Sequence, residues 1–270
     1  MIPPTLIDDI AIQSTDMLGN MVELRKPAIR IVSLVPSQTE LLFDLELNQE
    51  VVGITKFCIH PASWLQEKKI VGGTKNIHLD VIRALQPDLI IANKEENIEE
   101  TILSLQKEFP VWISDVNTIS EACYMIGEIG KLCDRTIAAQ HFISEINQNF
   151  ESLSKASALS GKKAVYYIWK NPWLTAGKHT FIHSMMEACG LQNESKEMRY
   201  PEVAPELLKK LDVDYIFLSS EPYPFKEEDK EYISQFIDKN KIIFVDGTYF
   251  SWYGSRLIKA PSYFIKLIFS

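Results

Sequence analysis

One segment constrains the fold of this chain more than any other: residues 134–158, DRTIAAQHFISEINQNFESLSKASA. Its apolar residues recur at steps of three and four, the spacing of one buried stripe on an α-helix: Ala139, Phe142, Ile143, Ile146, Phe150 and Leu153. We expect Asp134 to cap the start of this helix and Ser160-Gly161 to stop it. The flanking segments alternate between strand-like and helix-like patterns. The sequence therefore predicts two α/β lobes joined by one long rigid helix.

The segments before this helix alternate regularly. Residues 9–29 predict a hairpin with its turn at 16–20, and apolar runs at 31–35, 51–55, 88–91 and 111–115 predict strands. Helices are expected between these strands and at 119–132, and the spacing of Ser37 and Glu40 resembles a capping box. Strands alternating with helices at this spacing indicate a mainly parallel sheet.

A second alternating region follows the long helix. It begins with an aromatic-rich strand at 163–170 and continues with a helix at 181–190, where Gly190 suits the position after the helix end. Residues 80–91 align without gaps on residues 206–217, a weak internal repeat of a short helix running into a strand. We therefore expect an N-terminal α/β lobe at 1–133, a linking helix at 134–159 and a C-terminal α/β lobe at 160–270.

Composition excludes several functional classes. The chain has 270 residues, a formal net charge of -8 and no run rich in Lys and Arg, so no nucleic-acid partner is expected. No stretch approaches the roughly 18 apolar residues of a membrane span. The start, MIPPTLIDDIAIQ, lacks a basic region followed by an apolar one. As written the chain is expected to be cytoplasmic, or periplasmic if an export signal has been removed, and monomeric.

No catalytic or metal-binding motif stands out. The cysteines, at 58, 123, 133 and 189, form no C-x-x-C pair, and only Cys58 lies in a loop where reactivity is worth checking. Among the histidines only His179 and His183 have i, i+4 spacing, without an H-E-x-x-H signature. We expect no enzyme, no catalytic residues, no metal site and no intrinsic cofactor.

Aromatic side chains crowd the loops that follow predicted strands, where α/β proteins bind ligands. The candidate ligand-binding residues are Phe57, His60, Trp169, Trp173, Tyr200, Tyr249, Phe250, Trp252, Tyr253 and Arg256. A flat, partly apolar ligand such as a corrin or porphyrin needs aromatic faces and few polar contacts. His60 could ligate its metal or donate a hydrogen bond, and Arg256 could pair with an anionic group or with a neighbouring carboxylate. Alternatively, the rings cover the junction of the two lobes.

Several stretches together resemble one family: RIVSLVPSQTELLF, LDVIRALQPDLIIA, NPWLTAGKHTFIHSMMEACG and YPEVAPELL. They are similar to the cobalamin and siderophore substrate-binding proteins of ABC importers, and are nearest to the cobalamin-binding branch. The resemblance implies the helical-backbone periplasmic-binding-protein fold, with a corrinoid or haem held in an aromatic cleft between two lobes. It also implies that Phe57, Tyr200 and Tyr249 line the pocket. Thr74 and Asn93 stand where the cobalamin binder has further tryptophans.

The resemblance further implies that Asp80 and Glu206 dock onto an ABC permease if the protein is exported. Acidic residues in the first turn of a helix are also favoured by the helix dipole alone. Three other interpretations stay open. The ligand could be a ferric siderophore or another metal chelate, for which Arg199, Arg256 and Lys178 would supply positive charge. The protein could be a cytoplasmic enzyme or chaperone for corrinoids, or a regulatory module that binds another protein.

Overall fold

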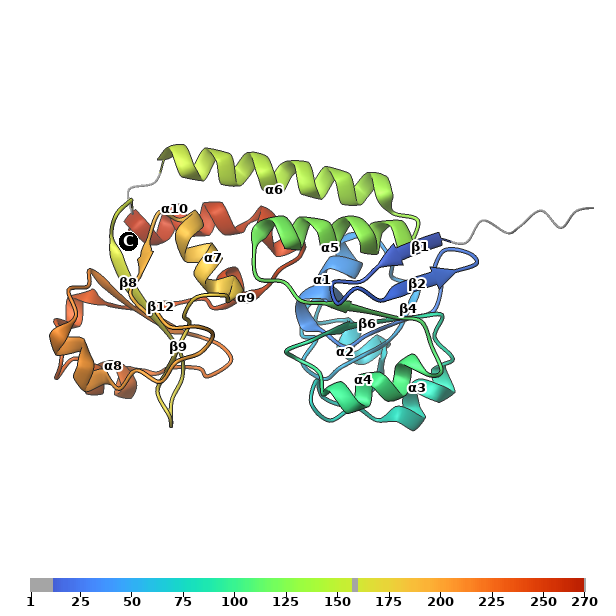
Figure 1. Cartoon of the computed structure of the whole chain (residues 1–270), viewed down its shortest axis with the longest axis horizontal. Coiled ribbons are helices and arrows are strands. Elements are labelled where there is room, and N and C mark those ends of the chain that lie inside the picture. The colour runs from blue at the N-terminus through green and yellow to red at the C-terminus, as the bar shows by residue number, and fades with distance from the viewer. Residues whose placement is uncertain (1–11, 157–159, 270) are drawn as a thin grey trace, which may run out of the picture. The chain divides into compact units, whose positions relative to one another are not determined.

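The computed structural model describes residues 12–156 and 160–269, so the start of the chain and the end of the predicted 134–158 segment lie outside the described residues. The chain forms two compact units (Figure 1). Of the described residues, unit 1 contains those up to Asp115 together with Cys123–Ile143, and unit 2 contains Val116–Ala122 together with those from Ser144 onward. No helix in the described ranges is long and apolar enough to span a membrane.

Unit 1 opens with the predicted hairpin. Strands β1 (Ile12–Thr15) and β2 (Met21–Leu24) pair antiparallel. Asp16 closes the turn, because its Oδ1 accepts hydrogen bonds from the backbone N–H groups of Leu18 (2.9 Å) and Asn20 (2.8 Å). Gly19 takes the positive φ of 87° that the turn requires.

The sheet of unit 1 has five parallel strands in the order β5-β4-β3-β6-β7. Their bounds are β3 (Ile31–Ser33), β4 (Val51–Ile54), β5 (Lys69–Ile70), β6 (Leu89–Asn93) and β7 (Val111–Ser114). The helices between them are α1 (Pro36–Asp44), α2 (Trp64–Glu67), α3 (Leu79–Leu85) and α4 (Glu99–Gln106). Ile82 of α3 and Leu105 of α4 pack into one buried cluster with Val32 and Ile90 of the sheet.

The predicted capping box of α1 is wrong. The N-cap is Val35, two residues before the expected Ser37; Pro36 lies in the first turn, and no side chain caps the helix. Proline suits this position because its missing N–H would have no partner there and its φ is already helical. Ser37 therefore lies inside the first turn rather than before it.

The sheet of unit 2 has the parallel order β10-β8-β11-β12, with β9 antiparallel to β8. Its strands are β8 (Lys163–Trp169), β9 (Leu174–Thr175), β10 (Gln192–Asn193), β11 (Tyr215–Ser219) and β12 (Ile242–Val245). Tyr167 packs in a cluster with residues of η1 and α8, while the adjacent Tyr166 contacts Phe250. The helical segments are α7 (Phe181–Ala188), η1 (Pro205–Lys210), α8 (Glu227–Ile233), η2 (Lys239–Lys241), α9 (Thr248–Ser251), η3 (Ser255–Ile258) and α10 (Ala260–Phe269).

Two consecutive helices, α5 (Ile119–Leu132) and α6 (Thr136–Ala156), contribute residues to both units. Asp134 does not cap α6 as expected. It has a φ of 54° and follows the end of α5, where the Arg135 N–H bonds the Gly130 carbonyl (2.7 Å). This is the pattern of a Schellman ending, in which a left-handed residue closes the preceding helix.

The predicted apolar stripe of α6 is confirmed. Ala139, Ile146 and Leu153 are buried, and Phe142, Ile143 and Phe150 are partly buried. Just before α6, Arg135 Nε donates to the Leu45 carbonyl of unit 1 (3.1 Å). Within unit 2, Asn149 Nδ2 of the same helix donates to the Ile258 carbonyl (3.0 Å). The helix is thus fixed to each unit by its own hydrogen bonds and its own buried side chains.

Candidate ligand-binding site

The loops after β11 and β12 meet at the carboxyl end of the unit 2 sheet. Parallel pairing places Ser219 beside Val245, so the segments that follow each strand emerge together. The Gly247 N–H donates to Ser220 Oγ at 3.0 Å. A Cβ on Gly247 would lie 2.3 Å from Ser219 Oγ and 2.8 Å from Glu221 Cγ. Only glycine allows the two loops to approach this closely.

Glu221 is the centre of this junction, and the sequence alone did not single it out. Its Oε1 accepts hydrogen bonds from Ser251 Oγ (2.5 Å) and from Trp252 Nε1 (2.8 Å). Burial raises the pKa of the Glu221 carboxyl, and the hydrogen bonds from Ser251 and Trp252 partly oppose that rise. No motif marks this glutamate; only the pairing of β11 with β12 brings it to the aromatic loop.

Arg256 lies against two rings of the same loop. Its guanidinium carbon is 4.6 Å from the centre of the Trp252 ring and 5.6 Å from that of Tyr249. Arg256 Nη1 also donates to Thr248 Oγ1 at 2.9 Å. The structure thus brings together three of the predicted site residues, and we call Glu221, Tyr249, Trp252 and Arg256 the last-loop cluster. Trp252 is only 7% exposed, whereas Tyr249 and Arg256 are half-buried, so the Tyr249 ring and the Arg256 guanidinium are the parts of the cluster that a flat ligand with an anionic group could reach.

Helix α10 packs against the last-loop cluster through Tyr263. Tyr263 stacks on Tyr249, with ring centres 4.4 Å apart and an interplanar angle of 14°. Its hydroxyl accepts a hydrogen bond from the backbone N–H of Asp246 (2.7 Å). Asp246 Oδ1 in turn accepts from Thr248 Oγ1 at 2.7 Å. These contacts tie the start of the loop to the end of the chain.

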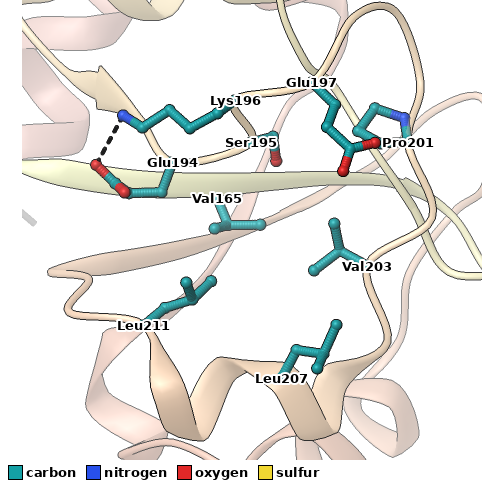
Figure 2. Close-up of a pocket in the computed structure, with 9 residues that line it drawn as sticks. All are labelled: Val165, Glu194, Ser195, Lys196, Glu197, Pro201, Val203, Leu207 and Leu211. Carbon is teal, nitrogen blue, oxygen red and sulfur yellow. Dashed lines mark hydrogen bonds and ion pairs between the residues drawn. The ribbon is translucent and has the colours of Figure 1, made fainter.

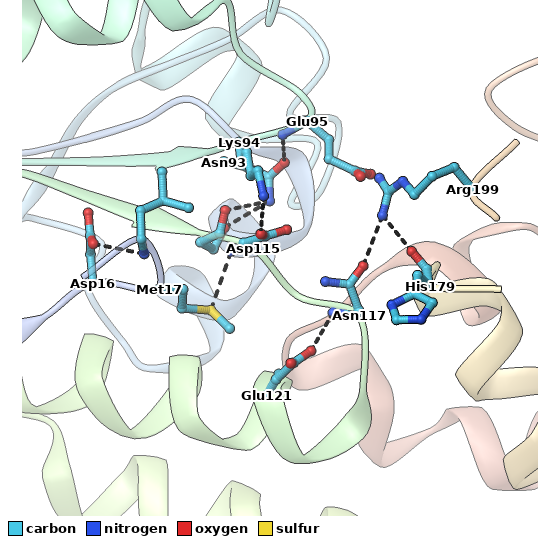
Figure 3. Close-up of polar contacts among 12 residues, drawn as sticks. Asp16, Met17, Asn93, Lys94, Glu95, Asp115, Asn117, Glu121, His179 and Arg199 are labelled. Carbon is cyan, nitrogen blue, oxygen red and sulfur yellow. Dashed lines mark hydrogen bonds and ion pairs between the residues drawn. The ribbon is translucent and has the colours of Figure 1, made fainter. Parts of the chain in front are cut away.

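Two predicted residues of unit 2 are exposed apart from this cluster. Trp169 is 40% exposed and meets Tyr223 edge-on. Tyr200 is 37% exposed, with the guanidinium of Arg199 5.3 Å from its ring centre. Arg199 Nη1 also donates to Asn117 Oδ1 (3.1 Å) and to the His179 carbonyl (2.5 Å), as Figure 3 shows.

Three other predicted residues belong mainly to the interior. Phe250 is completely buried among Tyr166, Phe217 and Phe264. Trp173 stacks on Phe225 and packs against the core of unit 2. Tyr253 is buried with its ring edge-on to Phe181. Phe250 has no surface that a ligand could touch unless the core moves.

In unit 1, the loop after β4 carries the predicted Phe57 and His60. Phe57 is 50% exposed, with Lys56 Nζ 5.1 Å from its ring centre, and His60 is half-buried. Cys58, the loop cysteine suspected of reactivity, is fully buried. Thr39 Oγ1 donates to its sulfur at 3.0 Å, and burial raises the pKa of its thiol. The thiolate is the reactive form of cysteine, and burial disfavours it here. Cys58 is therefore a core residue and not a reactive one.

Asn93 has a structural task. Its Nδ2 donates to Ser114 Oγ (3.0 Å), and its Oδ1 accepts the backbone N–H groups of Glu95 (2.8 Å) and Glu96 (2.9 Å), contacts that Figure 3 shows in part. These bonds organise the loop after β6. Thr74 is half-buried, and its carbonyl accepts from Asn97 Nδ2 at 3.1 Å. At both positions the residue is polar and built into the loop.

The two predicted docking carboxylates are exposed and engaged locally. Asp80 pairs with Arg83 at 2.9 Å within α3. Glu206 lies in the first turn of η1 and accepts a hydrogen bond from the Tyr232 hydroxyl at 2.7 Å, which lowers the pKa of the Glu206 carboxyl. The two halves of the repeat therefore differ: α3 is an α-helix, whereas η1 is a tighter 3₁₀ helix.

A cavity of about 230 Å³ in unit 2 contains none of the predicted site residues. Figure 2 shows aliphatic side chains on its floor and Glu194, Lys196 and Glu197 around it. In the repeat, Leu85 of α3 corresponds to Leu211 after η1. Leu85 fills its groove so closely that a Cβ on Gly53 would be 2.7 Å from its Cδ1, whereas Leu211 lines the cavity. The described residues also contain no group of three or more His, Cys, Asp or Glu able to hold a metal ion.

Comparison with known proteins identifies the family. A family model described as periplasmic binding protein matches residues 31–243. The protein belongs to the periplasmic binding protein family. This periplasmic binding protein is 26% identical over 227 residues to YvrC of Bacillus subtilis (strain 168), an uncharacterized ABC transporter substrate-binding lipoprotein, with 79% of this chain and 68% of the relative covered. It is 27% identical over 176 residues to the vitamin B12-binding protein of Salmonella typhi, with 64% of this chain and 65% of that relative covered.

The same fold occurs in solved structures. The periplasmic heme-binding protein RhuT of Roseiflexus sp. RS-1 aligns with a TM-score of 0.76 and 17% identity, covering 87% of this chain and 95% of RhuT. The prediction of an α/β helical-backbone periplasmic binding protein is confirmed. Members of this family bind ligands for ABC transporters. At such low identity, the similarity to RhuT shows the fold of this periplasmic binding protein and not its ligand.

Proposed function

We propose that this periplasmic binding protein binds a metal–tetrapyrrole, with a corrinoid as the first candidate. The observation that carries the proposal is the exposure of three rings: Phe57 (50%) and Tyr200 (37%) lie on loops, and Trp169 (40%) is the last residue of β8. Large exposed rings favour a ligand that covers them, because burial of apolar surface contributes about 25 cal/mol per Å². The vitamin B12-binding relative supports the choice of a corrinoid.

A titration of the purified, reduced protein tests this proposal. Aquocobalamin, cyanocobalamin and haem are added separately while the visible absorption of the ligand and the tryptophan fluorescence of the protein are followed. We expect micromolar or tighter binding of a corrinoid, with quenching of tryptophan emission. If none of the three compounds co-elutes with the protein or quenches its fluorescence, the proposed ligand class is wrong.

Variants of the exposed rings test whether the ligand contacts them. Phe57→Leu and Trp169→Leu should each weaken binding by about tenfold, which corresponds to about 1.4 kcal/mol of lost contact. Phe244→Leu is the matched control, since Phe244 is 37% exposed but lies inside β12, whereas Phe57 follows β4 and Trp169 is the last residue of β8. Equal affinities for all three variants would place the ligand elsewhere.

A second candidate is an anionic metal chelate, such as a ferric siderophore, and Arg256 favours it. The guanidinium lies over Trp252 and Tyr249, where a carboxylate of a ligand could meet both charge and ring. Arg256→Met should weaken binding of a carboxylate-bearing ferric siderophore by about tenfold while changing that of cyanocobalamin by less than about threefold. Equal losses for both ligands would show that Arg256 serves the loop and not an anionic group.

We also propose that Asp80 and Glu206 dock the loaded protein onto an ABC permease. Both carboxylates lie on the surface, at matching positions of the internal repeat. Asp80→Ala together with Glu206→Ala should abolish ligand uptake by cells while leaving the titration unchanged. Uptake at the normal rate would refute docking, and fractionation of those cells shows in which compartment the protein acts.

A further inference from the structure

One carboxylate oxygen contacts two side chains at the end of the last loop. Oε1 of Glu221 accepts hydrogen bonds from Ser251 Oγ and Trp252 Nε1, at the end of α9 and directly after it. Glu221 comes from the loop after β11, so these bonds cross between two loops that are far apart in sequence. Hydrogen bonds to a carboxylate that is largely buried are strong and directional. Ser251 and Trp252 are therefore held in one orientation relative to the sheet.

The packing behind this carboxylate leaves little freedom. A Cβ on Gly247 would overlap Ser219 Oγ and approach Glu221 Cγ, so the two loops are already in contact. Ser219 Oγ donates to the Glu221 carbonyl at 2.5 Å. Glu221 is thus fixed by its own backbone as well as by its side chain. A side chain restrained on both sides can serve as a template for the loop that it contacts.

The orientation of Trp252 in turn sets that of Arg256. The indole nitrogen points to Glu221, while the ring carries the guanidinium 4.6 Å from its centre. The ring centre of Tyr249 lies 5.6 Å from the same guanidinium carbon. Rotation of Trp252 about its side-chain bonds would remove this support. Contacts thus run in sequence from Glu221 through Trp252 to Arg256.

We propose that Glu221 is a positioning residue for ligand binding: it orients Trp252 and thereby presents Arg256 and Tyr249 to the ligand. This inference rests on the proposed function, because it concerns the residues that would meet that ligand. The relevant property of Glu221 is an oxygen acceptor at this place. Glutamine keeps such an oxygen at the same distance from the backbone, whereas alanine removes it.

The test compares Glu221→Gln with Glu221→Ala, using Glu228→Ala as the control because Glu228 is an exposed carboxylate of the same unit. Hydrogen–deuterium exchange of the ligand-free protein is the first readout. Glu221→Ala should speed exchange in peptides covering residues 247–256 and leave the hairpin at 12–24 unchanged. Glu221→Gln and Glu228→Ala should exchange like the wild type.

Titration with the corrinoid or haem that the wild type binds is the second readout. Glu221→Ala should weaken binding by about tenfold and Glu221→Gln by less than about threefold. Trp252→Phe, which keeps the ring but loses the N–H donor, should resemble Glu221→Ala. Wild-type exchange and wild-type affinity in Glu221→Ala would overturn the inference. A wild type that binds nothing would instead refute the proposed function, while the exchange readout would still test whether Glu221 holds the loop.

Discussion

Neighbouring residues of one loop have opposite fates in this protein. Tyr249 is half-buried with its ring centre 5.6 Å from the Arg256 guanidinium carbon, while Phe250 beside it is completely buried in the core. The sequence predicts an aromatic loop, but the side on which each ring lies depends on the one-turn helix α9, which is too short for a periodic pattern. Glu221 was missed for a related reason, since its partners are 30 residues away and only strand pairing brings them together.

The difference in stability between Glu221→Gln and the wild type should change with pH in one direction. Burial raises the pKa of Glu221 above its ordinary value of 4.5, so the folded protein holds this proton more tightly than the unfolded chain. Folding is therefore favoured while the proton is bound, and this contribution is lost as pH rises from the unfolded to the folded pKa. Because glutamine does not titrate, the free energy of unfolding of Glu221→Gln should gain on that of the wild type as pH rises. Urea unfolding at pH 4 and pH 7 measures this; a constant difference would contradict it.

A second residue prediction concerns the ion pair of Lys170 and Asp229. Lys170 Nζ lies 2.5 Å from Asp229 Oδ1, and the aspartate side chain is fully buried. Asp229→Asn keeps an acceptor for the Lys226 N–H but loses the charge, so it should lower the free energy of unfolding by about 1–3 kcal/mol. Glu228→Gln removes the same charge from an exposed neighbour and should change stability by less than about 0.5 kcal/mol. Similar losses in both variants would mean that the buried pair has no special role.

For the helices, sequence periodicity predicted where a helix occurs better than it predicted the residues at which the helix begins and ends. The apolar stripe of α6 and the whole span of α5 follow from spacing that one face of a helix requires. The ends depend on single residues that the pattern does not contain. Pro36 starts α1 early, and Asp134 closes α5 instead of opening α6. Both errors have the same origin, because a polar residue near a helix end can belong to either side of the boundary.

The approach of α5 to α6 gives a prediction with a built-in control. A Cβ on Gly130 would lie 2.4 Å from the Ala139 Cβ of α6, whereas one on Gly127 would come no nearer than 3.6 Å to its first neighbour, Ile143 Cδ1. Gly130→Ala should therefore destabilise the protein by about 1–3 kcal/mol through overpacking. Gly127→Ala should be neutral or stabilise it by up to about 1 kcal/mol, because alanine favours the helix. Thermal unfolding of both variants measures the difference, and equal melting temperatures would contradict close packing at Gly130.

For the whole molecule, α6 predicts a limited response to ligand. It runs without interruption through Thr136–Ala156, and a closing hinge would need large changes of φ and ψ at a few residues. An intact helix resists such changes because each turn is held by backbone hydrogen bonds. We expect the radius of gyration from solution scattering to stay the same with and without bound corrinoid. A clear decrease on binding would show that the helix bends or that the chain moves elsewhere.

The division of the chain also has a consequence for its biosynthesis. Val116–Ala122 belongs to unit 2, yet the ribosome makes it before the last residues of unit 1 and well before the rest of unit 2. When these seven residues are synthesised, their partners in unit 2 have not yet been made. One of these partners is Arg199, which donates a hydrogen bond to Asn117. A single cut through the chain would leave one product with an orphaned segment and the other with a missing one. The order of the residues along the chain therefore does not follow the division into units, and no single cut yields both units whole.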